Sequence, residues 1–247
     1  RAYWVSNSIE KFLTNPHKPV ILALSRPDRR KNLHTLIEVY GQDKELQSIA
    51  NLVIFAGIRK DISTKNDSEK EVLTNLLLAM DKYDLYGKMA IPKKHDVDNE
   101  VAIIYRYCAE KRGVFVNLTD HENFGLTIIE SSSSGLPVVV TKNGGPSEII
   151  PTCDSGHLVD PTNYRQIKKA ILDTLTNEEN WKTFSNKGAL NVHKYYSWEN
   201  HANQYIKLVQ ENLELSDGFG IKKKNYPGVD VTKLKNKVDK LIISDID

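Results

Sequence analysis

The sequence predicts an α/β fold in which helices cover both faces of a doubly wound parallel sheet. Short apolar segments alternate with amphipathic segments about six times along the chain, which is typical of strand–helix repeats. The apolar segments are nearly continuous runs rather than alternating patterns, as expected for strands that are buried on both faces. The length of 247 residues is sufficient to bury a substantial core.

The first half of the chain contains three of these strand–helix repeats. Strands are expected at residues 20–24, 52–57 and 89–91, and helices at 32–40, 68–83 and 101–110. The first helix illustrates the pattern, because Leu33, Leu36 and Ile37 recur at the spacing of a single helical face.

The second half repeats the pattern and then changes character. Strands are expected at 114–118, 138–140 and 157–159, and helices at 126–133, 164–175 and 198–213. Beyond residue 213, Ser216-Asp217-Gly218 and three consecutive lysines at 222–224 are typical of a linker. We therefore predict one domain over 1–213, a linker over 214–239 and the first strand of another unit over 240–247.

The bulk properties restrict the classes of partner. A net charge of +2 gives no reason to expect nucleic acid or an anionic membrane. No apolar segment approaches the roughly 20 residues that cross a bilayer, and the N-terminus lacks a signal-peptide pattern. Cys108 and Cys153 fit no metal-ligand spacing, which indicates a reducing, cytoplasmic compartment. Because the first residue is Arg1 rather than Met, we expect the chain to be part of a longer protein.

Several well-known motifs are absent from the sequence. There is no Gly-x-Gly-x-x-Gly after the first strand, no phosphate-binding Gly-x-x-x-x-Gly-Lys-Ser/Thr loop and no Gly-x-Ser-x-Gly. Asp96 and Asp98 lie in a polar loop, and neither His95 nor His121 has a second histidine at ligand spacing. We expect no metal site.

The loop after the first strand, residues 25–32, is strongly basic. Four of its residues are cations: Arg26, Arg29, Arg30 and Lys31. Ligands of doubly wound sheets bind at the carboxyl ends of the strands, where Arg and Lys could neutralise a diphosphate. The alternative is a solvated basic turn.

Two further loops follow later strands. In residues 119–130, Gly125 permits close approach to a helix start, and Glu122 and Glu130 could reach different parts of an extended ligand. Alternatively, Glu122 only complements the helix dipole and Glu130 is a surface residue. In the loop 141–148, the Gly144-Gly145-Pro146 turn favours a structural role, with Ser147 as a helix cap.

These loops resemble a known family. Glu122, Phe124-Gly125-Leu126 and Glu130 resemble the E-x7-E signature of retaining glycosyltransferases that have two Rossmann-like domains, the GT-B fold. Residues 23–32, 81–87, 135–137 and 141–146 are similar to the sucrose-phosphate synthases. Asn123 is a small departure, since it stands where many plant members carry proline. The resemblance covers residues 15–213 and implies the C-terminal half of a GT-B enzyme.

The resemblance implies roles for individual residues. Arg26 and Lys31 would hold the diphosphate of UDP-glucose, Glu122 the glucose hydroxyls and Glu130 the ribose hydroxyls; Arg26, Lys31 and Glu122 are the catalytic candidates. The donor-binding candidates are Gly57, Lys93, Asn123, Phe124, Gly125, Leu126, Thr127 and Glu130. Because cations and helix amides can stabilise the leaving diphosphate, no metal or cofactor is expected.

The resemblance also implies a reaction, the retaining transfer of glucose to fructose 6-phosphate. Its acceptor would bind an N-terminal GT-B domain that this chain does not contain, so the chain alone would bind the donor but transfer poorly. Alternatives are a sucrose synthase, a mannosylfructose-phosphate synthase, a nucleotide-sugar epimerase or a non-catalytic nucleotide-sugar-binding module.

The final segment, residues 240–247, resembles the first motif of haloacid-dehalogenase-type phosphatases. That motif is an apolar strand ending in Asp-x-Asp, here Asp245 and Asp247. In such enzymes the first aspartate attacks phosphate and the second acts as acid and base. The alternative is a fortuitous strand end.

Overall fold

The structure is a computed structural model that describes residues 2–93 and 99–218. The chain divides into two compact units, residues 1–200 and 201–247. Most of the predicted linker and the phosphatase-like Asp245 and Asp247 lie outside the described residues, as do His95, Asp96 and Asp98.

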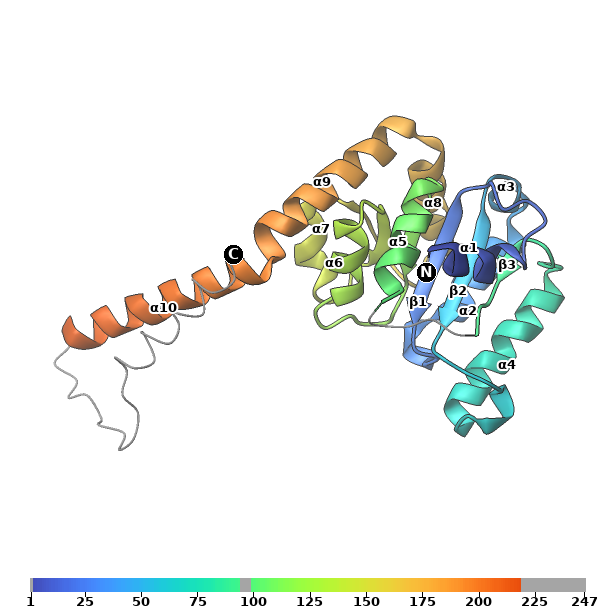
Figure 1. Ribbon diagram of the computed structural model, residues 1–247, viewed down its shortest axis with the longest axis horizontal. Helices are drawn as coiled ribbons and strands as arrows, with labels where there is room; N and C mark the ends of the chain where they lie inside the picture. Colours follow the sequence, from blue (N-terminus) through green and yellow to red (C-terminus); the bar gives the residue numbers. More distant parts are fainter. Residues whose placement is uncertain (1, 94–98, 219–247) are drawn as a thin grey trace. The chain divides into compact units, whose positions relative to one another are not determined.

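The first unit is built on a six-stranded parallel sheet (Figure 1). The strands are β1 (Val20–Ser25), β2 (Asn51–Ala56), β3 (Met89–Ala90), β4 (Val114–Asn117), β5 (Val138–Thr141) and β6 (Gly156–Val159). Their order is β3-β2-β1-β4-β5-β6, with every neighbouring pair parallel. The predicted doubly wound sheet is therefore confirmed.

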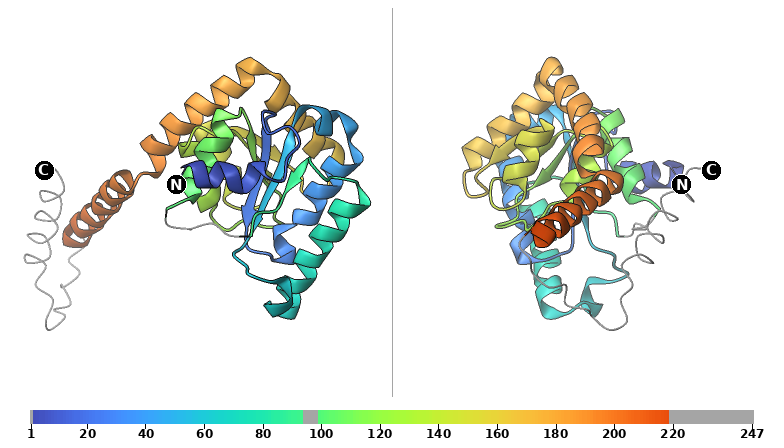
Figure 2. Two further views of the ribbon diagram at one scale, coloured as in Figure 1. Left: turned by 45° about the vertical axis from the view of Figure 1, so that its right-hand side comes forward. Right: turned by 90° about the vertical axis from the view of Figure 1, so that its left-hand side faces the viewer.

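Helices cover both faces of this sheet (Figure 2). They are α1 (Ala2–Glu10), α2 (Leu33–Gln42), α3 (Lys44–Ile49), α4 (Asp67–Lys82), α5 (Val101–Glu110), α6 (Leu126–Ser133), α7 (Pro146–Cys153), α8 (Tyr164–Thr176) and α9 (Glu178–Tyr196), with short 3-10 turns η1 (Arg29–Lys31) and η2 (Ile62–Thr64). Alternate residues of β1 serve the two sides: Ile21 packs in the core with α2, α4 and α8, whereas Leu22 packs in the core with α1, α5, α6, α7 and α9. Burial on both faces explains why the strands are continuously apolar.

The remaining helix, α10 (Trp198–Gly218), extends further than the sequence indicates. The predicted helix ended at residue 213, where the linker was expected to begin. Residues 214–218 are helical, so α10 runs five residues into the segment predicted as a linker. The turn-forming residues Ser216, Asp217 and Gly218 are the last three residues of α10, so they mark its end instead of lying beyond it.

The loops that follow β1, β2, β4 and β5 begin at the carboxyl edge of the sheet. β1 lies between β2 and β4, and the chain winds outward from it in both directions. This position is the topological switch point, where loops diverge to opposite faces and leave a crevice between them. The basic loop and the Glu122 loop flank this crevice.

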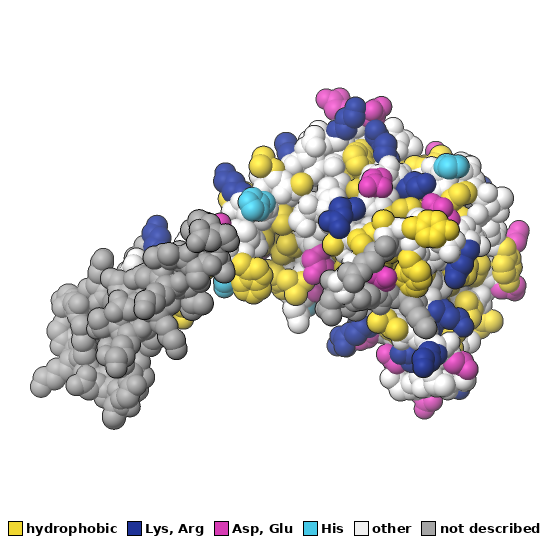
Figure 3. Space-filling view, in the orientation of Figure 1, with side chains coloured by type: hydrophobic (Ala, Val, Ile, Leu, Met, Phe, Trp, Pro, Cys, Tyr) yellow, Lys and Arg dark blue, Asp and Glu magenta, His cyan; other side chains and the backbone are white. Residues whose placement is uncertain are grey.

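The distribution of charge on the surface agrees with the nearly balanced charge of the sequence. On the face shown in Figure 3, basic and acidic side chains are interspersed over the described surface. Among the described residues, no helix combines the length and apolarity required to cross a membrane.

Candidate functional site

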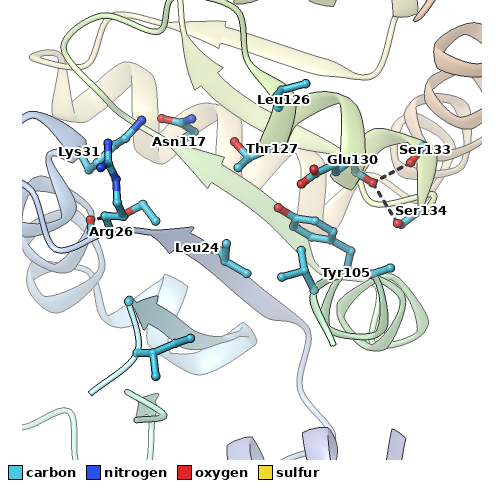
Figure 4. Close-up of a pocket in the computed structure, with 15 residues that line it drawn as sticks. Leu24, Arg26, Lys31, Tyr105, Asn117, Leu126, Thr127, Glu130, Ser133 and Ser134 are labelled. Atoms are coloured by element: carbon cyan, nitrogen blue, oxygen red, sulfur yellow. Dashed lines mark hydrogen bonds between the residues drawn. The ribbon is translucent and has the colours of Figure 1, made fainter. Parts of the chain in front are cut away.

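A cavity of about 880 Å³ lies at the carboxyl ends of β1, β2 and β4 (Figure 4). Its walls come from the loops after β1 and β2, from the start of α5 and from α6. The lining residues are Leu24, Ser25, Arg26, Lys31, Gly57, Ile58, Val101, Ala102, Tyr105, Asn117, Leu126, Thr127, Glu130, Ser133 and Ser134. This volume is in the range of cavities that hold a small organic ligand.

The four cations of the basic loop differ in their partners, and the turn η1 holds Arg29 and Arg30. Asp28 caps this turn by accepting from Arg30 N, and its carboxylate also binds the Arg30 guanidinium. These two hydrogen bonds lower the pKa of Asp28 to about 2. Arg29 instead forms an exposed ion pair with Glu71 of α4.

The other two cations, Arg26 and Lys31, line the cavity. Among the described residues no carboxylate pairs with the Arg26 guanidinium, whereas Lys31 Nζ lies 3.1 Å from Glu122 Oε2. The interpretation of this loop as a solvated turn therefore holds for Arg29 and Arg30, and an anion-binding role remains open for Arg26 and Lys31.

Glu122 is held by two donors on the same carboxylate oxygen. Besides Lys31, Asn117 Nδ2 donates to Glu122 Oε2 at 3.2 Å from the end of β4. Asn117 in turn accepts from Thr119 N through its Oδ1 at 3.1 Å. Glu122 is thus oriented beside the cavity before any ligand arrives, and it does more than complement the α6 dipole.

The three loops are joined through backbone oxygens. Thr119 Oγ1 and Asp120 N both donate to Arg30 O, at 2.7 and 3.0 Å, which fastens the Glu122 loop to the basic loop. On the other side, Glu122 N donates to Asn143 O at 3.1 Å, and Gly145 N donates to Glu122 O at 2.8 Å. The position of Glu122 therefore depends on both neighbouring loops.

Glycines permit this close approach. Gly144 has a φ of 92°, and a Cβ added there would lie 2.1 Å from Glu122 O. A Cβ on Gly145 would lie 2.2 Å from Phe124 O. The structural role expected for this turn is confirmed, although Ser147 is inside α7 and donates to Gly144 O instead of capping from outside.

Helix α6 presents its first turn and one carboxylate to the cavity. Gly125, with a φ of 106°, occupies the position before the helix, and Leu126 and Thr127 follow at its start. Backbone N–H groups in a first helical turn have no acceptor within the helix and favour an anion. Glu130 lies one turn further along, and partial burial raises the pKa of its carboxyl.

Comparison with known proteins assigns this architecture. The model for "Glycosyl transferases group 1" matches residues 5–190. The chain belongs to this glycosyltransferase family. Among its relatives, sucrose-phosphate synthase 4 of Arabidopsis thaliana is 44% identical over 204 residues, and the Zea mays sucrose-phosphate synthase is 44% identical over 201. These alignments cover 83% and 81% of this chain but only 19% of each relative, so the chain spans about a fifth of their length.

Solved structures share the fold. The sucrose-phosphate synthase from Thermosynechococcus elongatus is 25% identical with a TM-score of 0.65, and the match covers 81% of this chain and 46% of that one. HepE of Anabaena, solved in complex with UDP-glucose, is 15% identical with a TM-score of 0.64, covering 78% of this chain and 49% of that one. The predicted fold class and the resemblance to sucrose-phosphate synthases are confirmed; the phosphatase resemblance stays a prediction.

The glycosyltransferase domain brings most of the predicted site residues together. Arg26, Lys31, Gly57, Leu126, Thr127 and Glu130 all line the cavity, with Glu122 joined to Lys31 and Gly125 at the base of α6. Lys93 does not line it, and its Nζ donates to Lys60 O at 3.3 Å. Asn123 and Phe124 line a separate pocket of about 400 Å³ at the start of α7.

Other lining residues were not singled out from the sequence. Asn117 is the polar last residue of an otherwise apolar strand, and this contrast was the one sign in the sequence that it belongs to the site. Tyr105 lies among the buried residues of α5 and is fully buried, so periodicity indicates only a core position. Ser133 and Ser134 end α6 in a run of serines.

The described part of the chain places no cluster of metal ligands at this site. Over residues 2–93 and 99–218, no group of three or more His, Cys, Asp or Glu side chains could hold a metal ion. Among the described residues that line the cavity, the positive charges come from Arg26 and Lys31.

Proposed function

We propose that this domain binds UDP-glucose and serves the retaining transfer of glucose to fructose 6-phosphate, which yields sucrose 6-phosphate. The observation that carries the proposal is the convergence of Arg26, Lys31 and Glu130 on one cavity, with Glu122 held by Lys31 at its edge. The identity of 44% to sucrose-phosphate synthases supports the choice of donor and acceptor.

The two cavity cations are suited to the diphosphate. Arg26 provides a planar fork for phosphate oxygens and Lys31 a compact charge. The free amides at the start of α6 would add further donors. As the sugar leaves, negative charge grows on the departing diphosphate, and donors already in place stabilise that charge without reorganisation.

The two carboxylates would bind hydroxyl groups at opposite ends of the donor. Glu122, held by Lys31 and Asn117, would accept from the glucose, and Glu130 would accept from the ribose. The direct contact between Lys31 and Glu122 would place the diphosphate and the sugar side by side. No metal or cofactor is required in this arrangement, because Arg26 and Lys31 supply the neutralising charge.

The acceptor would bind elsewhere. The described cavity has no second basic cluster for a sugar phosphate, so fructose 6-phosphate would be held by the N-terminal GT-B domain. In this proposal, the donor site is active only when that domain closes over it.

Calorimetry with UDP, ADP and GDP tests the donor site. Wild-type protein should bind UDP, and Arg26→Ala and Lys31→Ala should each weaken binding by about 1–3 kcal/mol, as expected for loss of a charge-assisted hydrogen bond. Arg29→Ala is the matched control, because it removes a cation from the same loop that pairs with Glu71 instead. Tighter binding of ADP or GDP would change the donor, and absence of binding in a longer protein that carries this domain would refute the site.

The acceptor is tested by turnover in that longer protein. UDP-glucose with fructose 6-phosphate should give sucrose 6-phosphate. A product formed only with free fructose would indicate sucrose synthase activity, and turnover with GDP-mannose would indicate the mannosyl reaction. UDP-glucose binding without turnover of any acceptor would indicate a non-catalytic module.

A further inference from the structure

Tyr105 carries a buried hydroxyl group for which the described residues provide no partner. The residue is 0% exposed and forms part of the cavity wall. Its hydroxyl has no hydrogen bond among the described residues. Tyrosine hydroxyls usually find a partner when buried, and an unpaired buried polar group costs about 1–3 kcal/mol.

Other buried tyrosines of this domain satisfy their hydroxyls. Tyr40 donates to Ala50 O at 2.9 Å. Tyr107, two residues from Tyr105 on α5, donates to Glu10 Oε1 at 3.0 Å. Tyr105 is also fixed in place, because its ring packs edge-on against Phe115 with the centroids 5.6 Å apart. The unpaired group is therefore specific to the tyrosine at the cavity.

Glu130 lies beside Tyr105 on the cavity wall (Figure 4). Figure 4 shows the Tyr105 hydroxyl directed toward the Glu130 side chain. The negative charge of Glu130 adds to the effect of burial in raising the pKa of Tyr105. The neighbouring Ser133 and Ser134 hydroxyls donate to the Glu130 backbone oxygen at 2.8 and 2.9 Å, so they leave its carboxylate to another donor.

A donor and an acceptor thus border the same space without pairing to each other. The group that satisfies both is a hydroxyl, which accepts one hydrogen bond and donates another. A carbonyl could pair only with Tyr105, because the ionised Glu130 carboxylate has no proton to donate, and an amide N–H would leave the Tyr105 proton without an acceptor.

We infer that Tyr105 and Glu130 together bind one ribose hydroxyl of the donor, and that Tyr105 makes the site discriminate against nucleotides that lack this hydroxyl. The hydroxyl accepts from Tyr105 and donates to Glu130. This inference rests on the proposed function, because it takes a nucleoside diphosphate as the ligand.

The test is a titration of UDP, 2′-deoxy-UDP and 3′-deoxy-UDP into wild-type protein and Tyr105→Phe. The substitution removes only the hydroxyl and keeps the ring against Phe115. Wild-type protein should bind one of the deoxy analogues at least about tenfold more weakly than UDP, because the missing hydroxyl would make both hydrogen bonds. Tyr105→Phe should lose a similar factor for UDP and show a much smaller difference between UDP and that analogue.

Tyr107→Phe is the matched control, since it removes a hydroxyl from the same helix that is bonded to Glu10. It should keep the wild-type discrimination. Glu130→Gln provides a second variant, and it should also reduce the difference between UDP and the same analogue. In addition, Tyr105→Phe should melt at a higher temperature than wild type without ligand, because it no longer buries an unpaired group.

The results separate this inference from the proposed function. Wild-type binding of UDP with unchanged affinity or unchanged discrimination in Tyr105→Phe would overturn the role of Tyr105 and leave the donor site intact. A wild-type protein that binds none of the nucleotides would overturn both.

Discussion

Lys31 and Glu122 are 91 positions apart in the chain, yet Lys31 Nζ lies 3.1 Å from Glu122 Oε2. This pair connects the loop after β1 to the loop after β4 across the switch point of the sheet. Both side chains are largely shielded, with 27% and 16% of their surfaces exposed. Their interaction is therefore screened less than that of a surface pair.

Replacing Lys31 with Ala should affect both stability and binding. The loss leaves Glu122 with Asn117 as its one described side-chain donor, so we expect a destabilisation of about 1–2 kcal/mol by urea unfolding. Arg29→Ala breaks an exposed pair and should cost less than about 1 kcal/mol, with UDP affinity unchanged. Equal losses for the two variants would show that the Lys31–Glu122 pair is no stronger than a surface ion pair.

Asn117→Ala should separate sugar binding from nucleotide binding. Its Nδ2 orients Glu122, the proposed sugar ligand, from the end of β4. We expect affinity for UDP-glucose to fall by about fivefold, less than a full charge-assisted hydrogen bond because Lys31 still holds Glu122, and affinity for UDP to change little. Calorimetry with both ligands checks this, and a parallel loss for UDP would contradict the assignment of Glu122 to the sugar.

Gly144→Ala should displace the Glu122 loop. The added methyl would meet Glu122 O at 2.1 Å, and the positive φ strains any L side chain. We expect a loss of about 2–4 kcal/mol in unfolding free energy together with weaker binding of UDP-glucose. Gly135→Ala is the control: its φ of 75° is also positive, but its nearest neighbour is Ser185 Oγ at 3.3 Å, and neither residue lines the cavity. That variant should lose about 1 kcal/mol and bind normally.

Glu130→Gln should stabilise the ligand-free domain at neutral pH. Burial raises the pKa of Glu130 above its ordinary 4.5, so the folded state holds the proton more tightly than the unfolded state. The ionised carboxyl therefore costs stability above the folded pKa, and this cost disappears as pH falls below 4.5. We expect a gain of less than about 1 kcal/mol at pH 7, because the side chain is partly exposed and screened.

Thermal melting of wild type and Glu130→Gln between pH 4 and pH 8 checks this expectation. The difference in melting temperature should be largest at neutral pH and close to zero at pH 4. A variant less stable than wild type at pH 7 would show that the carboxylate contributes favourable contacts in the empty site.

Local sequence patterns determined the fold class. Apolar runs such as 52–56 report burial on both faces, and the helical spacing of Leu33, Leu36 and Ile37 reports one buried face. These signals depend on neighbouring residues alone, so they can be recognised without the tertiary structure. The end of α10 lies five residues beyond the predicted one, because Ser216-Asp217-Gly218 forms the end of the helix and not the start of the segment that follows it.

The sequence alone also located the loops that flank the cavity, with Arg26, Lys31, Glu122 and Glu130 among their residues. Only the tertiary structure decided which side chains face it. The η1 turn directs Arg29 and Arg30 away, while Asn117 and Tyr105 join the site from a strand end and a helix face. These outcomes depend on the directions of side chains from segments far apart in the chain, and folding alone brings such segments together.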